Sequence, residues 1–139
     1  MPGDILCTPT ERIWTENSGV RTSPRVLIVD ASRESREVLR MLLEFRGATT
    51  IEAVGPLEGL PLADSFHPDL ILFDADSDSS ATGAPTDELR QTASRNNTPI
   101  VILGKAKHFY SELQTGQFVA KPYHYGPLIR KIDELLAAA

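Results

Sequence analysis

The sequence is poor in the features that mark secreted and membrane proteins. Its only cysteine is Cys7, which excludes an internal disulfide and favours a reducing compartment. No apolar run approaches the roughly 18 residues that a membrane span requires. The N-terminus carries Asp4 and lacks an apolar core, so we expect no secretory signal. We therefore expect a cytoplasmic protein that does not contact membranes.

Positive charge is also scarce. The chain has 14 Lys and Arg against 19 Asp and Glu, a formal net charge of −5, which argues against direct nucleic-acid binding. The remaining composition, 41% hydrophobic and 24% charged over 139 residues, is that of an ordinary globular chain with one core. These numbers indicate one domain and leave its function open.

The first 24 residues have no sustained hydrophobic period. They are rich in Pro, Thr, Ser and Gly, and they predict a flexible N-terminal tail that ends in a linker at Ser18–Pro24. The alternative is that Ile13 and Trp14 dock on the domain or on a partner. Residues 25–139 are expected to form the folded domain.

Five short runs predict β-strands. The clearest is Leu70–Phe73, four apolar residues within the acid-flanked stretch Pro68–Asp78. Such a run is too short for a helix and is typical of a central strand that is buried on both faces. The other predicted strands are Val26–Val29, Thr49–Val54, Pro99–Leu103 and, at an edge, Gln117–Ala120.

Helical patterns fall between these runs. Ser32 is expected to cap a helix whose apolar stripe (Val38, Leu39, Leu42 and Leu43) stops at Gly47. The remaining helices are predicted at Leu57–Phe66, interrupted by Gly59 and Pro61, at Thr86–Asn96, at Lys107–Gln114, and from Pro127 onward. Strands that alternate with helices predict an α/β fold, a flavodoxin-like doubly wound parallel sheet with five strands and five helices.

Four predicted strands end in chemically informative residues: Asp30, Asp74, Gly104 and Lys121. Because the carboxyl ends of parallel strands share one edge, where ligands bind, two carboxylates and an ammonium should converge. Paired carboxylates suit Mg²⁺, and an ammonium suits a phosphoryl group. Asp74 is therefore a candidate to accept a phosphoryl group as an acyl phosphate. The alternative is that the two acids only cap the loops that follow them.

These segments resemble the receiver domain of bacterial two-component response regulators. The matching stretches, in the family's order, are Val26–Asp30 with Arg36 and Leu39, then Pro68–Asp74, Pro99–Leu103 and Phe118–Pro122. The resemblance extends from Arg25 to the C-terminus. It implies a (βα)5 fold and a signalling role without enzymatic activity. Its implied partners are a histidine kinase or phosphotransfer protein and a downstream protein, and it allows a homodimer. Because no effector segment follows the last helix, we expect output through protein–protein contacts.

The resemblance also assigns a role to each site residue. Asp74 would be the phospho-acceptor, and Lys121 the phosphate-binding lysine, joined to Pro122 by a cis peptide bond. Mg²⁺ would be held by Asp30, Asp74 and the backbone carbonyl of Asp76. The two switch positions would be Gly104 and Phe118.

The sequence departs from the family pattern near the metal site and at one switch position. Ala31 stands where the family has a second acid that binds Mg²⁺ directly, so we expect a weak metal site. Gly104 replaces a Thr or Ser hydroxyl, and the segment from Gly104 to Lys121 is short, which trims the fourth helix. These departures favour, as an alternative, a pseudo-receiver that binds partners without being phosphorylated.

A different family offers a third interpretation. Asp74-Ala75-Asp76 resembles the first motif of haloacid-dehalogenase-type phosphatases, in which the first acid is the nucleophile and the second a general acid. That family requires a Ser or Thr at the end of the next strand, where this chain has Gly104. We rank this interpretation last.

Overall fold

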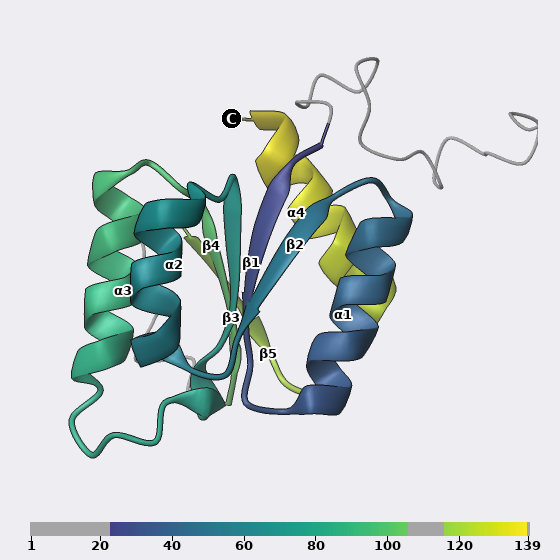
Figure 1. The fold of residues 1–139 in the computed structure, drawn as a ribbon. Helices are drawn as coiled ribbons and strands as arrows, with labels where there is room; N and C mark the ends of the chain where they lie inside the picture. Colours follow the sequence, from purple (N-terminus) through teal and green to yellow (C-terminus); the bar gives the residue numbers. More distant parts are fainter. Residues whose placement is uncertain (1–22, 106–115, 139) are drawn as a thin grey trace, which may run out of the picture.

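The computed structural model describes residues 23–105 and 116–138, and these fold as alternating strands and helices (Figure 1). The strands are β1 (Arg25–Val29), β2 (Thr49–Ala53), β3 (Leu70–Asp74), β4 (Ile100–Gly104) and β5 (Gly116–Ala120). The helices are α1 (Arg33–Phe45), α2 (Pro56–Phe66), α3 (Ala84–Arg95) and α4 (Tyr125–Ala138), with a 3-10 turn η4 (Ala75–Ser77). Within these ranges, no helix has the length and apolarity to cross a membrane.

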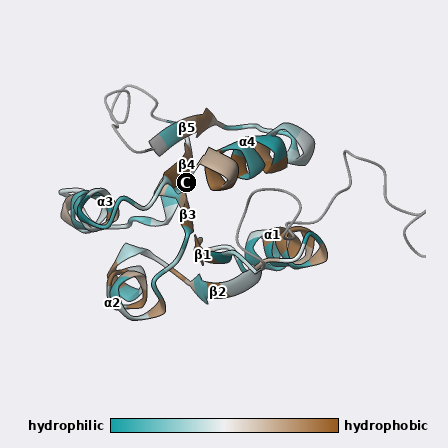
Figure 2. Cartoon of the chain, turned by 90° about the horizontal axis from the view of Figure 1, so that it is seen from above, coloured by the Kyte–Doolittle hydropathy of each residue, from teal (hydrophilic) through white to brown (hydrophobic). Residues whose placement is uncertain are grey.

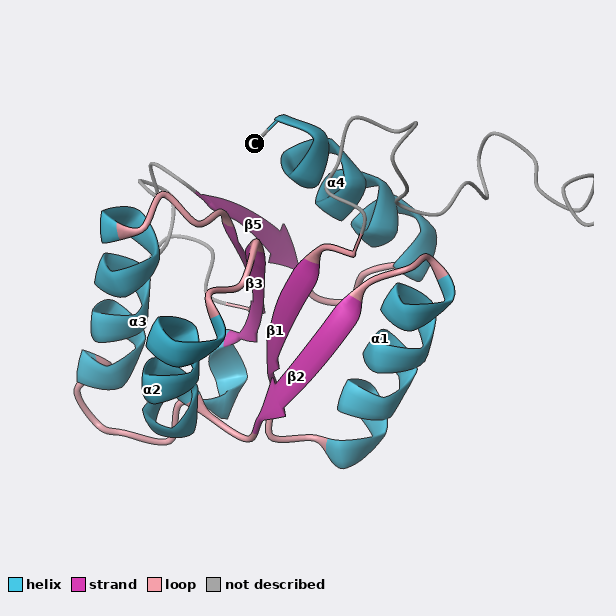
Figure 3. Ribbon diagram, turned by 45° about the horizontal axis from the view of Figure 1, so that its top comes forward, coloured by secondary structure: helices cyan, strands magenta, loops and turns pink. Residues whose placement is uncertain are grey.

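All five strands pair in parallel, in the order β2-β1-β3-β4-β5. Helices α1 and α4 cover one face of the sheet, and α2 and α3 cover the other (Figures 1 and 2). The predicted central strand is indeed the middle strand, and every residue of β3 and β4 is buried. The predicted doubly wound α/β fold is confirmed, with helices on both faces of the sheet (Figure 3). Because all five strands are parallel, their carboxyl ends share one edge.

The core is divided in two by the sheet. Because successive strand residues point to opposite faces, alternate residues of β1 and β3 contribute to different layers. The layer under α1 and α4 contains Val26, Ile28, Leu70, Leu72, Leu39, Leu43, Leu128 and Ile132. The layer under α2 and α3 contains Leu27, Val29, Ile71, Phe73, Ala63, Leu89, Ile100 and Ile102. Burial of this apolar surface on both faces fixes the strand ends in register.

The prediction that α2 is interrupted was wrong, because the helix is continuous through Gly59 and Pro61. A Cβ at position 59 would lie 3.1 Å from Cγ2 of Val29. Glycine is therefore present because α2 packs closely against β1, and it does not break the helix. Packing against the sheet outweighs the low intrinsic helix propensity of this segment.

Two helix starts were also predicted too late. Helix α3 begins at Ala84 rather than Thr86, and α4 begins at Tyr125 rather than Pro127. In both helices a proline lies in the first turn, where backbone N–H groups have no partner within the helix and proline is tolerated. The predicted cap on α1 is confirmed, because the Ser35 N–H donates to Ser32 Oγ at 3.2 Å. The helix predicted at Lys107–Gln114 lies outside the described residues.

Candidate functional site

The candidate site lies where the central strands end. Asp74 is the last residue of β3 and pairs in register with Leu103 of β4. Lys121 follows β5, and its N–H donates to the carbonyl of Gly104 at 3.0 Å. Strand pairing therefore brings Lys121 next to Asp74, although the two are far apart in sequence. The predicted cis bond between Lys121 and Pro122 is confirmed.

Lys121 binds two carboxylates. Its Nζ donates to Oδ2 of Asp74 at 2.7 Å and to Oδ2 of Asp76 at 2.9 Å. The other Asp74 oxygen, Oδ1, accepts a hydrogen bond from the Asp76 N–H at 2.9 Å. The Asp74 carboxylate is therefore held at both oxygens, and Asp76 fixes it through its backbone and through Lys121.

Asp30 is the second buried acid at this edge, with 2% of its surface exposed. Its Oδ1 accepts from the Ser32 N–H at 2.9 Å, whereas its buried Oδ2 has no hydrogen-bond partner among the described residues. Arg36 donates to the Asp30 carbonyl at 2.8 Å and to Glu52 at 2.9 Å, which fixes the loop. The unpartnered oxygen is a position that a cation or a water molecule would satisfy.

The two partners of the central ion pair both have raised pKa values. Burial raises the pKa of Asp74, and the charge of Asp30 adds to this, so the opposing effect of Lys121 is outweighed. Burial lowers the pKa of Lys121, but its hydrogen bonds to Asp74 and Asp76 raise it by more. At neutral pH the ionised Asp74 is thus stabilised by Lys121 yet remains unfavourable to bury beside Asp30.

This balance predicts that Asp74→Asn increases stability at neutral pH. A group with a raised folded-state pKa contributes stability below its unfolded pKa, and this contribution is lost as pH rises through the folded value. An amide cannot ionise, and Lys121 keeps Asp76 as a partner. We expect the free energy of unfolding to rise by about 1 kcal/mol at pH 7 in urea titrations, with the gain shrinking toward pH 4.

Asp78 provides the matched control for this measurement. It accepts hydrogen bonds from Ser80 and from both the N–H and the hydroxyl of Thr86 in the first turn of α3. Burial raises the pKa of Asp78, but these hydrogen bonds outweigh it and the net pKa is lowered. Asp78→Asn should therefore destabilise the protein at neutral pH. A loss of stability in both variants would contradict the unfavourable burial of Asp74.

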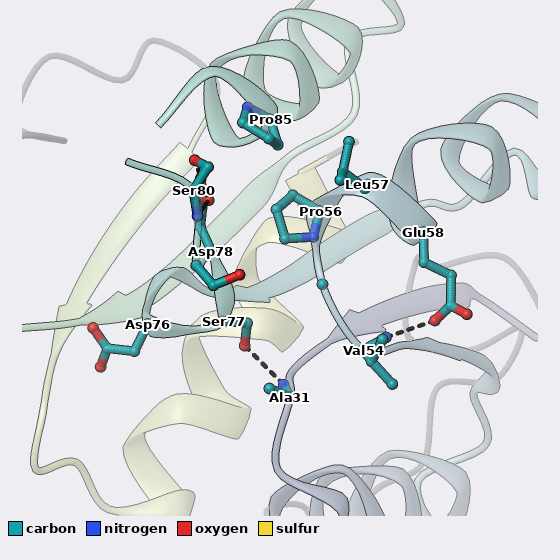
Figure 4. A pocket seen from close by; sticks show the side chains of 12 residues that line it. Ala31, Val54, Pro56, Leu57, Glu58, Asp76, Ser77, Asp78, Ser80 and Pro85 are labelled. Atoms are coloured by element: carbon teal, nitrogen blue, oxygen red, sulfur yellow. Dashed lines mark hydrogen bonds between the residues drawn. The ribbon is translucent and has the colours of Figure 1, made fainter. Parts of the chain in front are cut away.

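The metal ligands at this edge are few. No group of three or more His, Cys, Asp or Glu able to hold an ion occurs in the described part of the chain. Ala31, Asp76, Ser77 and Asp78 are among the residues that line a pocket of about 640 Å³ (Figure 4). Ser77 Oγ accepts from the Ala31 N–H at 2.8 Å and so ties the loop after β1 to η4.

Gly104 and Phe118, the two predicted switch positions, are adjacent in the structure. A Cβ at position 104 would lie 3.7 Å and 3.9 Å from two ring carbons of Phe118, and 3.4 Å from Cβ of Ala75. The ring of Phe118 thus lies beside the place that a side chain at 104 would fill. The distances are ordinary van der Waals contacts, so a small side chain fits there without forcing the ring to move far.

Tyr123 belongs to the site and was missed by the sequence reasoning. It lines a pocket of about 480 Å³ with Lys105, Lys121 and Pro122. Burial raises its pKa, helped by Tyr125 and by the charges of Asp30 and Asp74, against a hydrogen bond with Ser35. Its ring packs edge-on against that of Tyr125, with centroids 5.7 Å apart. The only sequence signal was its position directly after Lys121-Pro122.

Comparison with known proteins gives no match by sequence. No family model matches the chain. No curated protein matches it either.

Solved structures do match, at low identity. Chemotaxis protein CheY4 of Vibrio cholerae aligns with a TM-score of 0.68 and 20% identity, over 83% of this chain and all (100%) of its own. A receiver domain of a signal transduction histidine kinase from Syntrophus aciditrophicus aligns with a TM-score of 0.72 and 23% identity, over 84% of this chain and 92% of its own. A putative response regulator from Chloroflexus aurantiacus aligns with a TM-score of 0.72 and 23% identity, over 84% of this chain and 99% of its own. The chain therefore has the fold of response-regulator receiver domains.

Proposed function

We propose that this domain receives a phosphoryl group on Asp74 from a histidine kinase or phosphotransfer protein and signals through protein–protein contacts. The observation that carries the proposal is the position of Asp74. Its carboxylate lies at the end of the central strand, and one oxygen is 2.7 Å from the Lys121 ammonium. Only 10% of the Asp74 side chain is exposed, so the acid is sheltered yet within reach of a donor.

The chemistry needs a nucleophile and a group that meets the transferred phosphoryl. An Asp74 oxygen forms a bond to phosphorus as the bond from phosphorus to the donor histidine nitrogen breaks. The electron pair of that bond returns to the imidazole, which takes up a proton. The Lys121 ammonium then donates to a phosphoryl oxygen in place of Asp74, and Asp76 keeps that ammonium oriented.

The residues present are compatible with Mg²⁺, though with few ligands. Asp30, through its unpartnered buried oxygen, Asp74 and the backbone carbonyl of Asp76 would hold the ion. When bound, Mg²⁺ neutralises charge on the phosphoryl oxygens and commonly uses only one or two protein carboxylates. Ala31 supplies no further ligand, so the proposed site is weak.

The test is incubation of the full chain with a small phosphodonor, such as phosphoramidate, in the presence of Mg²⁺, followed by intact mass. The proposal predicts a species heavier by one phosphoryl group, and less of it when EDTA replaces the metal. A folded protein that shows no such species over a range of donor and Mg²⁺ concentrations would contradict it.

Two observations favour a second candidate, a pseudo-receiver that docks a partner without phosphorylation. Lys121 already pairs with both Asp74 and Asp76, and Ala31 removes a metal ligand. This candidate predicts no mass change with phosphodonor. It also predicts partner binding that is the same for wild type and for Asp74→Asn.

If Asp74 is phosphorylated, we expect the signal to reach Phe118 weakly. In the family that this chain resembles, a hydroxyl at the end of the fourth strand moves toward the phosphoryl group, and the aromatic turns into the vacated space. Gly104 has no side chain to move, and the Phe118 ring already lies beside it. A ligand shifts an equilibrium only by its differential affinity for the two states. Amide chemical shifts of Gly104 and of residues 116–121 should therefore change little when a phosphoryl mimic binds.

The matched variant is Gly104→Thr. A Cβ at 104 would meet only ordinary contacts, and the backbone there is not left-handed, so the variant is expected to fold. It should enlarge the response of Phe118 to the mimic. Large shifts in the wild type, equal to those of Gly104→Thr, would show that coupling does not need the hydroxyl.

A further inference from the structure

Helix α1 carries an apolar stripe on its outer surface. Val38, Met41 and Phe45, here called the α1 stripe, are 38%, 62% and 74% exposed. Their spacing of three and four residues places them along one face of the helix. The opposite face carries Leu39 and Leu43, which are buried in the core. The described residues thus leave this stripe open to solvent, on the outside of a helix that already has its own core face.

The surroundings of the stripe suit an apolar occupant. Four charged residues beside it form ion pairs, Arg33 with Glu37 at 3.2 Å and Arg40 with Glu44 at 3.3 Å. Glu34 lies one turn before Val38 on the same face and is exposed, so the stripe is apolar from Val38 to Phe45 and is bordered by an acid at its N-terminal end. Six large hydrophobic side chains of the described residues are exposed, and three of them lie in this stripe. Such a cluster of exposed apolar side chains is typical of an interaction site.

The chain enters the domain beside the end of this helix. Ser23 Oγ donates to the carbonyl of Gly47 at 3.3 Å and lies 2.7 Å from Oγ1 of Thr49. Pro24 accepts a hydrogen bond from the Thr49 N–H at 2.9 Å. Phe45, the last residue of α1, precedes Gly47 by two residues. Residues 1–22 are thus attached at the Phe45 end of the stripe.

The attached segment has suitable length and composition. Trp14, the only tryptophan of the chain, precedes Ser23 by nine residues and follows Ile13. Nine extended residues span at most about 30 Å, whereas the stripe from Val38 to Phe45 is roughly 10 Å long. A tethered segment also acts at an effective concentration in the millimolar range, so a modest contact is enough to keep it bound.

We propose that the N-terminal segment of this chain docks on the α1 stripe, with Ile13 and Trp14 as its anchors. The indole and the isoleucine side chain would cover Met41 and Phe45, which are the most exposed members of the stripe. The segment then occupies a face of the helix whose first turn supports the loop carrying Asp30. A protein that binds this same face must first displace the segment.

The test uses the fluorescence of Trp14 in the full 139-residue chain. Docking predicts emission at shorter wavelength, and weaker quenching by acrylamide, than in a peptide of residues 1–22. Met41→Ser and Phe45→Ser should each move the emission toward that of the peptide and increase quenching several-fold. Both side chains lie outside the core, so each variant should still form the folded domain. The matched control is Leu57→Ser on α2, across the sheet, where Leu57 is 71% exposed and the emission should not change.

Three results would overturn the proposal. Wild-type emission equal to that of the peptide would mean that Trp14 is not docked. Shielded emission that is unaffected by Met41→Ser and Phe45→Ser would place Trp14 elsewhere. Shielding that appears only as the protein dimerises, measured by sedimentation at several concentrations, would mean that a second copy covers the stripe.

Discussion

Replacing Asp74 by Asn should abolish phosphoryl transfer to this domain. The amide is a poor nucleophile and cannot form the acyl phosphate, so the expected product is lost entirely rather than slowed. Asp76→Asn and Asp78→Asn should both retain the added mass. Asp76 donates its backbone N–H to Asp74 and accepts one hydrogen bond from Lys121. Asp78 accepts a hydrogen bond from the Thr86 N–H in the first turn of α3. Intact mass after incubation with phosphoramidate and Mg²⁺ measures all three variants.

Two controls make this result specific to residue 74. Asp74→Asn is expected to be at least as stable as the wild type, so a missing product does not report unfolding. Acid lability of the added group distinguishes an acyl phosphate from a phosphoester on a nearby serine such as Ser77. Phosphorylation of Asp74→Asn at wild-type level would place the acceptor elsewhere. Turnover of a phosphate ester that needs both Asp74 and Asp76 would instead support the phosphatase interpretation.

The sheet could be predicted from the sequence because strands buried on both faces leave a strong signal. Leu70–Phe73 and Val26–Val29 are continuous apolar runs, and both are strands in the structure. Helix α2 was harder to predict. Gly59 allows the helix to pack closely against Val29, and a contact between segments this distant in sequence leaves no local pattern. The start of α3 was placed after Pro85 and that of α4 at Pro127, although the whole first turn of a helix accepts proline, so both starts were predicted two residues late.

The candidate site was predictable only in outline. The sequence suggested that Asp30, Asp74 and Lys121 gather at one edge, since parallel strands end together. It did not reveal that Lys121 bridges Asp74 and Asp76, or that Asp30 keeps one oxygen without a partner among the described residues. These features depend on side-chain conformations and on the path of η4, which no periodic pattern encodes. Tyr123 was missed for the same reason.

The Ala31→Asp substitution should strengthen Mg²⁺ binding at least about tenfold, because it adds a carboxylate to a proposed site that has two. Ala31 is exposed and lines the pocket that also contains Asp76 and Ser77, so a longer side chain has room there (Figure 4). Its backbone N–H already bonds to Ser77 Oγ, and that contact does not involve the new side chain. Calorimetric titration with MgCl₂ measures the affinity of both proteins.

The matched variant is Ala31→Asn, which supplies an oxygen of similar position without the charge and should give a smaller gain. In the absence of metal, Ala31→Asp should also be less stable than the wild type at neutral pH, because a third acid joins Asp30 and Asp74, and Mg²⁺ should reverse this loss. Tight binding by the wild type that Ala31→Asp leaves unchanged would show that the missing carboxylate is replaced by another ligand. The weak site proposed for this chain would then be wrong, and Asp76, whose side chain is half exposed beside Lys121, would be the first residue to substitute.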